Sequence, residues 1–453
     1  MVTGKIHILG IGGTFMGGLA LIARELGFEV SGSDQNLYPP MSDMLQISGI
    51  PLELGYESTA WVSKVNAVVI GNALSRGNPS VEEVLNKNLP FYSGPQWLYE
   101  QVLKDKHVIA VAGTHGKTTT TTMIAWILEQ AGLNPGFLIG GIPNGFTTMA
   151  RVTPSRYFVI EADEYDTAFF DKRPKFLHYR PKTCLLNNIE FDHGDIYDNL
   201  AQIKKQFHYL VRSVPGNGTV VVNEEDKNVL ETLQQGCWSK KIGFSLEKTS
   251  DVSAKKIEKD GSVFEVFYRG ESQGLLRWKH CGDHNVSNAL AAITCAADIG
   301  ISVEKSLQAL STFGGVKRRL EVRGVVRGVT VYDDFAHHPT AIRKTLQGLR
   351  AKIGAQRIIA VLQFGSNTML QGQHQHELHE AFEGADEVVL LDPKKEWNVN
   401  ALTQKLSQPT HFYSNVSEIV AYLAQHLKSE DHVLIMSNKG FDGVHQKLLE
   451  ALR

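Results

Sequence analysis

Cysteine is scarce in this chain. The 453 residues include four cysteines, which are far apart and form no CxxC pair (Cys184, Cys237, Cys281 and Cys295). This spacing argues against a structural zinc site and against a disulfide framework. Free thiols are typical of the reducing cytoplasm, where we expect the protein to work. The sequence also lacks a run of about 20 apolar residues, so we predict no membrane-spanning helix and no membrane partner.

The chain has no large excess of charge of either sign. Its 46 Lys and Arg residues face 48 Asp and Glu residues, which gives a formal net charge of −2. No global positive field is therefore present to attract nucleic acid, and we expect no nucleic-acid partner. An anionic ligand must be bound by local groups, such as helix N-termini and single Lys or Arg side chains. The composition does not indicate an oligomeric state.

Short apolar segments recur along the chain, and each is followed by a turn and a helix-like stretch. This alternation is typical of α/β proteins with parallel sheets. At roughly 100–200 residues per domain, the length predicts three domains. We predict a Rossmann-like N-terminal domain over residues 1–105, a central P-loop ATPase domain over 106–316 and a Rossmann-like C-terminal domain over 317–453. The expected strands include Lys5–Leu9, Ala67–Ile70, His107–Ala112, Tyr157–Ile160, Thr183–Leu186, Arg357–Leu362, Glu387–Leu391 and His432–Met436.

One region of the second domain breaks this alternation. Residues Lys240 to Lys279 are predicted to form antiparallel strands, and Asp260-Gly261 is a strong hairpin-turn signal. We interpret the region as an antiparallel β insertion in the central domain.

A glycine-rich turn follows the first expected strand. It reads Gly10-Ile11-Gly12-Gly13-Thr14-Phe15-Met16, and Asp34 follows about 20 residues later. Glycines let the backbone approach a pyrophosphate, and the N-terminus of the next helix favours an anion. Because Phe15 stands where the dinucleotide fingerprint needs its third glycine, a nicotinamide dehydrogenase is disfavoured. A nucleotide diphosphate ligand remains the expectation, and a tight turn without a ligand is the alternative.

A second glycine turn has the features of a phosphate loop. The strand His107–Ala112 runs into the loop, which is Gly113-Thr114-His115-Gly116-Lys117-Thr118-Thr119. Amides of such a loop surround the phosphates of ATP, the lysine places a charge on the transferred phosphoryl group, and the Thr118 hydroxyl can bind Mg²⁺. In the usual GxxxxGK[ST] pattern the first glycine would stand at position 111, where this chain has Val111. The first glycine here is Gly113, so the loop is two residues tighter than the usual phosphate loop.

Polar clusters follow the next two expected strands. Glu161-Ala162-Asp163-Glu164-Tyr165-Asp166 contains four carboxylates, whose mutual repulsion a Mg²⁺ ion would relieve. Asn187-Asn188-Ile189-Glu190-Phe191-Asp192-His193 comes after the strand Thr183–Leu186, where open α/β sheets bind ligands. A solvated acidic loop and a structural histidine at 193 are the alternatives.

Taken together, and in this order, these motifs resemble those of the muramyl (Mur) ligases. The resemblance also rests on Gly282–Leu290, Arg318–Glu321 and Asp333–Thr340. It implies an ATP-dependent enzyme that joins an amine to the carboxylate of UDP-N-acetylmuramate through an acyl phosphate, with Mg²⁺ as cofactor. It also implies that the third domain closes over ATP and the incoming amine.

The resemblance assigns roles to individual positions. It implies that Lys117, Glu161 and His193 are catalytic and that Thr118, Glu161 and His193 surround the metal ion. ATP would be bound by the phosphate loop together with four residues further along the chain, namely Asn285, Asn288, Arg319 and Asp334. The UDP-sugar would be bound by Gly12, Gly13, Thr14, Phe15, Met16, Asp34, Asn72, Ser75, His115, Asn188 and His338.

Within the family, four segments are most similar to members that attach the tripeptide L-alanyl-γ-D-glutamyl-meso-diaminopimelate to UDP-N-acetylmuramate in peptidoglycan recycling. They are Gly13–Gly18, Tyr38–Ser42, Gly71–Pro79 and Ser93–Leu98. Two alternatives stay open: an enzyme that adds L-alanine, and a nucleotide-binding regulator without turnover. One departure concerns the peptide. Gln363-Phe364-Gly365 stands where these members carry Glu-Pro-Arg, and Lys439 is a hypothetical replacement for that arginine.

Overall fold

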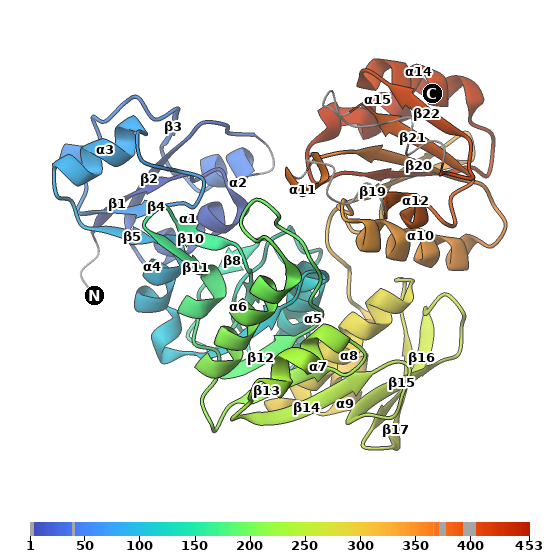
Figure 1. Ribbon diagram of the computed structural model, residues 1–453, viewed down its shortest axis with the longest axis horizontal. Helices are drawn as coiled ribbons and strands as arrows, with labels where there is room; N and C mark the ends of the chain where they lie inside the picture. Colours follow the sequence, from blue (N-terminus) through green and yellow to red (C-terminus); the bar gives the residue numbers. More distant parts are fainter. Residues whose placement is uncertain (1–3, 39–40, 366, 371–376, 393–404) are drawn as a thin grey trace.

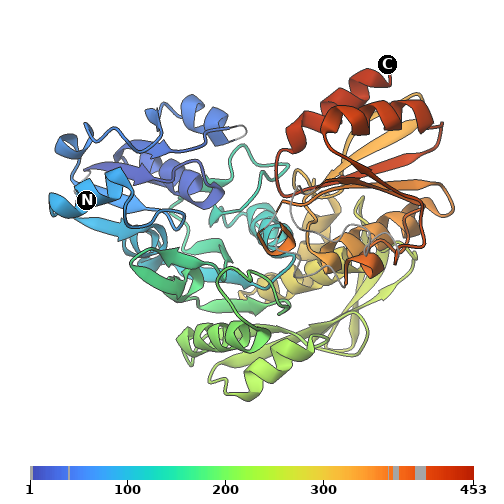
Figure 2. The same ribbon diagram turned by 45° about the horizontal axis from the view of Figure 1, so that its top comes forward.

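The computed structural model describes residues 4–38, 41–365, 367–370, 377–392 and 405–453. The described chain forms three α/β bodies, each built on its own main sheet, and this confirms the predicted three-domain α/β fold. The first and third bodies both sit on the central one (Figure 1), and α5 lies in the middle of the molecule (Figure 2). Within the described residues, no helix combines the length and apolar character needed to span a bilayer.

The first body is a five-stranded parallel sheet with the order β3-β2-β1-β4-β5. Its strands are β1 (Lys5–Leu9), β2 (Glu29–Asp34), β3 (Leu52–Leu54), β4 (Ala67–Ile70) and β5 (Phe91–Ser93), and its helices are α1 (Thr14–Glu25), α2 (Met41–Ile47), α3 (Pro79–Asn86) and α4 (Gly94–Gln101).

The contact between the first and central bodies depends on a glycine in α1. A Cβ atom at Gly18 would lie 2.3 Å from the Leu138 side chain and 3.4 Å from Ala150, so a larger residue would push the two bodies apart. The apolar side chains of both bodies form one continuous core across this contact, and the site between the bodies is therefore held at a fixed geometry.

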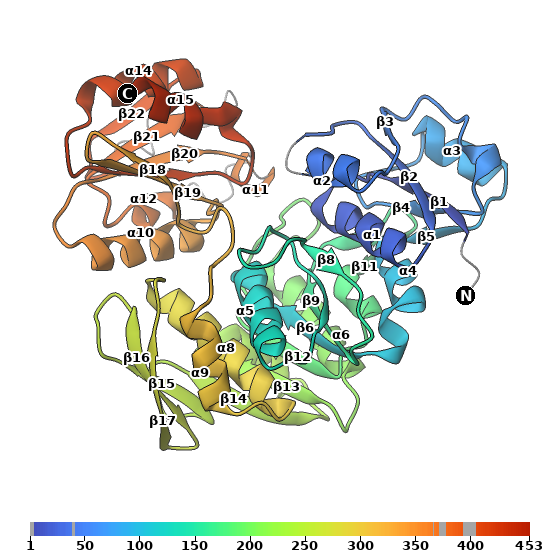
Figure 3. The same cartoon turned by 180° about the vertical axis from the view of Figure 1, so that it is seen from behind.

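The central body has ten strands in the order β17-β16-β15-β14-β13-β12-β6-β9-β7-β8. They are β6 (His107–Ala112), β7 (Gly136–Leu138), β8 (Ala150–Arg151), β9 (Tyr157–Ala162), β12 (Thr183–Leu186), β13 (Thr219–Asn223), β14 (Lys240–Ser245), β15 (Val252–Lys256), β16 (Val263–Tyr268) and β17 (Glu271–Arg277). Helices α5 (Lys117–Gln130), α8 (Asp283–Asp298) and α9 (Val303–Ser311) cover one face (Figure 3), and α6 (Leu200–Ser213) and α7 (Lys227–Gln234) cover the other (Figure 1). A small hairpin pairs β10 (Asp166–Ala168) with β11 (Asp171–Pro174).

The region predicted as antiparallel needs a partial correction. The strands β15, β16 and β17 are antiparallel to one another, and Gly261 turns the chain between β15 and β16 as expected. However, β14 pairs with β13 in parallel, and β15 also begins in parallel beside β14. These strands continue the central sheet to its edge at β17. The register shifts between Val266 and Phe267 opposite Gly274, which has a φ of 112°.

The third body is a six-stranded sheet with the order β18-β19-β23-β20-β21-β22, parallel except for the β18–β19 pair. Its strands are β18 (Glu321–Val326), β19 (Val329–Asp334), β20 (Ile358–Gln363), β21 (Glu387–Leu391), β22 (Thr410–Tyr413) and β23 (His432–Met436), and its helices include α10 (Pro339–Ile353), α11 (Asn367–Leu370), α12 (Leu378–Ala381), α14 (Val416–His426) and α15 (Val444–Ala451).

Candidate active site

A cavity of about 1580 Å³ lies where the three bodies meet. It brings together nearly all the residues that the sequence singled out. Two of them do not line it: Gly113 is buried at the start of the phosphate loop, and Ser75 is exposed on the loop before α3. The predicted residues that do line it are Gly12, Gly13, Thr14, Phe15, Met16, Asp34, Asn72, Thr114, His115, Gly116, Lys117, Thr118, Thr119, Glu161, Asn188, His193, Asn285, Asn288, Arg319, Asp334 and His338.

The phosphate loop is fixed from below by an amide network. Gly116 has a φ of 81°, and a Cβ atom there would lie 2.6 Å from Asn288 Oδ1, so the loop can only carry glycine at this position. Asn187 Nδ2 donates to Asn288 Oδ1 over 3.1 Å and to the His115 carbonyl over 3.2 Å. Asn288 therefore packs beneath the loop in this structure, whereas Asn285 donates to the Cys281 carbonyl over 2.7 Å. Because α5 begins at Lys117, its unpaired N–H groups lie at the loop.

Lys117 is held between a buried carboxylate, Glu164, and a partly buried one, Asp163. Its Nζ lies 2.7 Å from Glu164 Oε2 and 3.7 Å from Asp163 Oδ1. Burial lowers the pKa of Lys117, but the charges of Glu164 and Asp163 outweigh burial and raise it above its usual range. Lys175 lies 3.0 Å from the other oxygen of Asp163. Lys117 is therefore a cation positioned by Asp163 and Glu164, two members of the carboxylate run that the sequence associated with Mg²⁺.

A second group connects the phosphate loop to the linker before the third body. Thr118 Oγ1 donates to Glu161 Oε2 over 3.2 Å, and the Gly140 N–H donates to the other oxygen of Glu161. Arg319 Nη2 donates to Thr118 Oγ1 over 3.3 Å. Burial raises the pKa of Glu161 in spite of these partners. The structure thus places Thr118, Glu161 and Arg319 in one polar cluster, in which Thr118 is buried and the other two are partly buried.

His193 lies beside Glu164 rather than in direct contact with Glu161. Its Nε2 is 3.1 Å from Glu164 Oε1, and suitable ligand atoms of Asp163, Glu164 and His193 lie within 4.8 Å of one another. Burial lowers the pKa of His193, but the hydrogen bond and charge of Glu164 outweigh it and raise the pKa. The φ of His193 is 57°, a backbone conformation that non-glycine residues rarely adopt and that is often found at functional sites.

The first body contributes the glycine turn and the start of α1. The Gly12 N–H donates to Asp34 Oδ2 over 2.8 Å, which joins the turn to the end of β2. The helix begins at Thr14, so its N-terminus lies at the cavity. The Phe15 ring lies there too, with Lys175 Nζ 5.6 Å from its centre. This face offers backbone amides, a carboxylate and an aromatic ring to a ligand.

The third body contributes Asp334 and the start of α10. Asp334 accepts hydrogen bonds from the N–H groups of Leu320 (2.6 Å) and Ala336 (2.8 Å), and burial raises its pKa. His338 caps α10 and is buried, with 4% of its surface exposed. His115 Nε2 lies 3.2 Å from Glu190 Oε2, and the rings of His115 and His338 are 4.6 Å apart. Glu190 belongs to the predicted polar cluster after β12 but had no predicted role, and it lies at the junction of two bodies.

The departure at Gly365 has a local packing explanation. A Cβ atom at Gly365 would lie 1.9 Å from Asn438 Oδ1, so the Asn438 side chain occupies the space that a side chain at 365 needs. Lys439 follows directly and is exposed at the cavity wall. Arg318 Nη2 donates to the carbonyl of Ser437 (2.6 Å) and to that of Lys439 (2.7 Å), which fixes the backbone of this segment.

This cavity, with a phosphate loop and ligand-binding sheet edges from three α/β bodies, is that of a nucleotide-dependent ligase. Three family models match: the Mur ligase family catalytic domain over residues 5–105, the Mur ligase middle domain over 111–296 and the Mur ligase glutamate ligase domain over 318–439. The chain belongs to the Mur ligase family.

Individual relatives are similar over the whole length. The chain is 51% identical to a protein of Escherichia coli K12 named UDP-N-acetylmuramate–L-alanyl-γ-D-glutamyl-meso-2,6-diaminoheptandioate ligase, covering 99% of this chain and 98% of the relative. It is 34% identical to a UDP-N-acetylmuramate–L-alanine ligase of Desulfitobacterium hafniense over 98% of the chain and 99% of that relative. The crystal structure of a murein peptide ligase from Psychrobacter arcticus has a TM-score of 0.78 and 44% identity, covering 99% of this chain and 98% of that one.

Proposed function

We propose that this protein is an ATP-dependent ligase of peptidoglycan recycling that joins L-alanyl-γ-D-glutamyl-meso-diaminopimelate to the carboxylate of UDP-N-acetylmuramate. The observation that carries the proposal is Lys117, a partly buried cation at the start of α5, in a cavity to which all three bodies contribute. The 51% identity with a relative of that name supports the choice of substrates. The four free thiols fit a cytoplasmic enzyme.

The proposed reaction proceeds in two steps. The carboxylate oxygen of UDP-N-acetylmuramate attacks the γ-phosphorus of ATP; a C–O–P bond forms, the bond to the β-phosphate oxygen breaks, and ADP leaves. The amine of the tripeptide then attacks the acyl carbon, and the tetrahedral intermediate expels phosphate as the amide forms. An α-amino group has a pKa near 8, so an appreciable neutral fraction is already present and a strong base is not required. The protein's main tasks are positioning and charge stabilisation.

Each part of the site has a place in this proposal. The N–H groups at the start of α5 and the Lys117 ammonium would hold the transferred phosphoryl group. Arg319 and Asp334 would reach ATP from the linker and the third body. The turn at Gly12 and the start of α1 would bind the UDP pyrophosphate, with Asn72 close by. His115, Asn188 and His338 would lie along the muramyl group.

Mg²⁺ is part of the proposal, and the donor atoms suit it. Thr118 and Glu161 offer a hydroxyl and a carboxylate 3.2 Å apart, and the raised pKa of Glu161 reflects a buried carboxylate that a cation would stabilise. Hard oxygen ligands of this kind are those that Mg²⁺ prefers. We propose that Thr118, Glu161 and His193 hold the ion, and that Asp163 and Glu164 add negative charge nearby. The bound ion would neutralise phosphate charge.

The proposal is tested by ADP release from the full-length protein with a panel of amines. We expect release that requires both UDP-N-acetylmuramate and the tripeptide, with mass spectrometry detecting the amide product. L-alanine at matched concentration separates this function from that of the L-alanine-adding relatives, and faster turnover with L-alanine would overturn the choice of substrate. If ADP binds but no release occurs with any amine, the chain is a nucleotide-binding regulator instead.

A further inference from the structure

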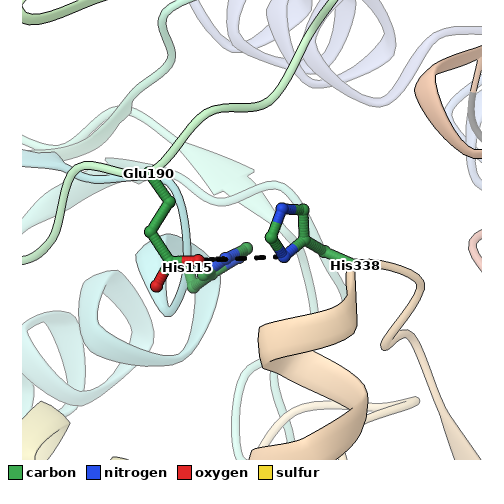
Figure 4. Close-up of side chains that lie close together, drawn as sticks. All are labelled: His115, Glu190 and His338. Atoms are coloured by element: carbon green, nitrogen blue, oxygen red, sulfur yellow. Dashed lines mark hydrogen bonds and ion pairs between the residues drawn. The ribbon is translucent and has the colours of Figure 1, made fainter. Parts of the chain in front are cut away.

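Three potential metal ligands from three separate segments meet beside the phosphate loop. Figure 4 shows His115 from the loop, Glu190 from the segment after β12, and His338 at the start of α10. Glu190 Oε2 lies 3.2 Å from His115 Nε2 and 3.8 Å from His338 Nδ1, and the three ligand atoms lie within 4.8 Å of one another. His338 is buried, and the side chains of His115 and Glu190 are 16% and 28% exposed.

Hydrogen bonds from neighbouring groups fix the orientation of His338 and Glu190, as is usual for metal ligands. His338 Nε2 lies 3.3 Å from the Phe191 carbonyl. A hydrogen bond to this carbonyl requires a proton on Nε2. In that tautomer the Nδ1 atom, which faces Glu190, carries a lone pair. Thr340 Oγ1 donates to Glu190 Oε2 over 2.6 Å. A histidine ligand generally donates its other N–H to a carbonyl, and a ligating carboxylate is generally hydrogen-bonded as well. The Thr340 N–H donates a long hydrogen bond of 3.3 Å to His338 Nδ1. Coordination of a metal ion by Nδ1 would replace this hydrogen bond.

We propose that His115, Glu190 and His338 bind one transition-metal ion of the zinc class. Two imidazoles and one carboxylate are a ligand set that Zn²⁺ uses when its fourth position is open. His115 and His338 line the cavity, so the open position is accessible to an oxygen ligand such as a carboxylate or phosphate.

This site differs in chemistry from the proposed Mg²⁺ site. Among the described residues, the other group of three potential ligands is Asp163, Glu164 and His193, which shares His193 with the proposed Mg²⁺ ligands and is richer in carboxylate oxygen. The site at His115 has two nitrogen donors, which suit zinc-class ions better than Mg²⁺. An ion bound there would join α10 of the third body to the phosphate loop of the central body. Its presence does not depend on the proposed ligase activity.

The test uses Co²⁺ as a spectroscopic probe in the full-length protein. The protein is loaded with Co²⁺ and dialysed against excess Mg²⁺; the retained cobalt is then counted by elemental analysis, and its visible absorption is recorded. We expect one retained Co²⁺ per chain with the strong absorption of a four-coordinate ion. Glu190→Gln and His338→Asn are expected to lose it, and Asn preserves the helix cap at position 338. Thr340→Val is expected to weaken Co²⁺ affinity by roughly 10- to 100-fold.

His193→Gln is the matched control, because it alters the other potential metal group and should keep the retained Co²⁺. Circular dichroism verifies that each variant is folded, and if Glu190→Gln does not fold, His115→Gln serves in its place. The proposal is overturned if the wild-type protein retains no cobalt in excess Mg²⁺, or if the ligand variants retain as much as the wild type. These measurements involve no turnover, so their failure is separate from failure of the proposed ligase function.

Discussion

At the scale of single residues, Lys117 combines a functional and a structural role. Its ammonium lies 2.7 Å from Glu164, whose side chain is 2% exposed. Removal of one partner of such a buried pair leaves an uncompensated charge, which typically costs about 3–5 kcal/mol of stability. A simple loss of activity in a Lys117 variant would therefore mix two effects, and a second substitution is needed to separate them.

We predict that Lys117→Met lowers kcat by roughly 10²–10³ because a charge directed at the transferred phosphoryl group is removed. The double variant Lys117→Met/Glu164→Gln should recover much of the lost stability, since the unpaired carboxylate is neutralised. It should not recover turnover. The measurements are kcat by ADP release and the free energy of unfolding by urea titration. Wild-type turnover in the single variant would refute the assignment of Lys117.

The second residue-scale prediction concerns Lys439. This side chain is exposed at the cavity wall beside Gly365, where the sequence lacks the expected arginine. If Lys439 binds a carboxylate of the incoming peptide, Lys439→Ala should raise the KM for the tripeptide by about tenfold, the loss of about 1.4 kcal/mol of binding, with kcat little changed. Lys447→Ala, on an exposed ion pair with Asp442, is the matched control. An unchanged KM would remove Lys439 from peptide recognition.

The sequence predicted those site residues that belong to contiguous motifs. Lys117 and Thr118 come after the loop that follows β6, and Glu161 lies near the end of the neighbouring strand β9, so their proximity could be expected from the order of the motifs. The order of the motifs could not show which of the carboxylates in residues 161–166 contacts Lys117, because this depends on the path of the chain after β9. Glu190 was missed for a related reason: its partner Thr340 lies 150 residues away and belongs to another body.

At the scale of elements, prediction succeeded where a strand is a continuous apolar run. His107–Ala112, Thr183–Leu186 and His432–Met436 have the bounds that the sequence indicated, because buried parallel strands need apolar residues on both faces. The direction of β14 was predicted wrongly. Its sequence is compatible with either direction, and only the pairing with β13 decides it. Very short strands such as β8 depend on tertiary contacts and have no local signal.

The helix α5 gives the element-scale prediction. It begins with a lysine followed by five threonines, which are weak helix formers, so its first turns rely on packing. Within the described part of the chain, the buried hydroxyls of Thr120 and Thr121 have no hydrogen-bond partner. We expect Thr121→Val, which keeps the shape and removes the hydroxyl, to stabilise the protein by about 1 kcal/mol. Thr122→Val should destabilise it, because the Thr122 hydroxyl donates to the Thr118 carbonyl over 2.7 Å.

Urea titration of both variants decides this prediction, and the opposite signs make each one the control of the other. If Thr121→Val were as destabilising as Thr122→Val, the hydroxyl at position 121 would have to contribute a stabilising interaction in solution.

At the scale of the whole molecule, each of the three bodies contains a buried or partly buried histidine with a lowered pKa. Burial lowers the pKa of His7 to about 3, and that of His284 and of His445 to about 4. Below pH 6.5 the unfolded chain takes up protons at these positions and the folded chain does not, so stability must fall as the pH falls. As the pH falls below 6.5, each histidine lowers the free energy of unfolding by up to about 1.4 kcal/mol per pH unit, until the pH reaches the pKa of that histidine in the folded chain.

We therefore predict that the free energy of unfolding decreases from pH 7 to pH 5, as measured by urea titration at constant ionic strength. His7→Gln should reduce this dependence on pH, because the hydroxyls of Ser31 and Ser33 that bond to His7 would meet a side chain that does not titrate. The exposed His426→Gln is the control and should leave the dependence unchanged. Equal stability at pH 7 and pH 5 would contradict the prediction.

The outer edge of the central sheet also matters for how the molecule behaves at high concentration. An open edge strand presents unpaired backbone groups and invites another chain to add to it. The shifted register opposite Gly274 interrupts the regular spacing that such an addition needs, and the exposed Glu271 and Arg277 place charges at both ends of β17. The irregularity beside this edge strand thus disfavours aggregation through the edge.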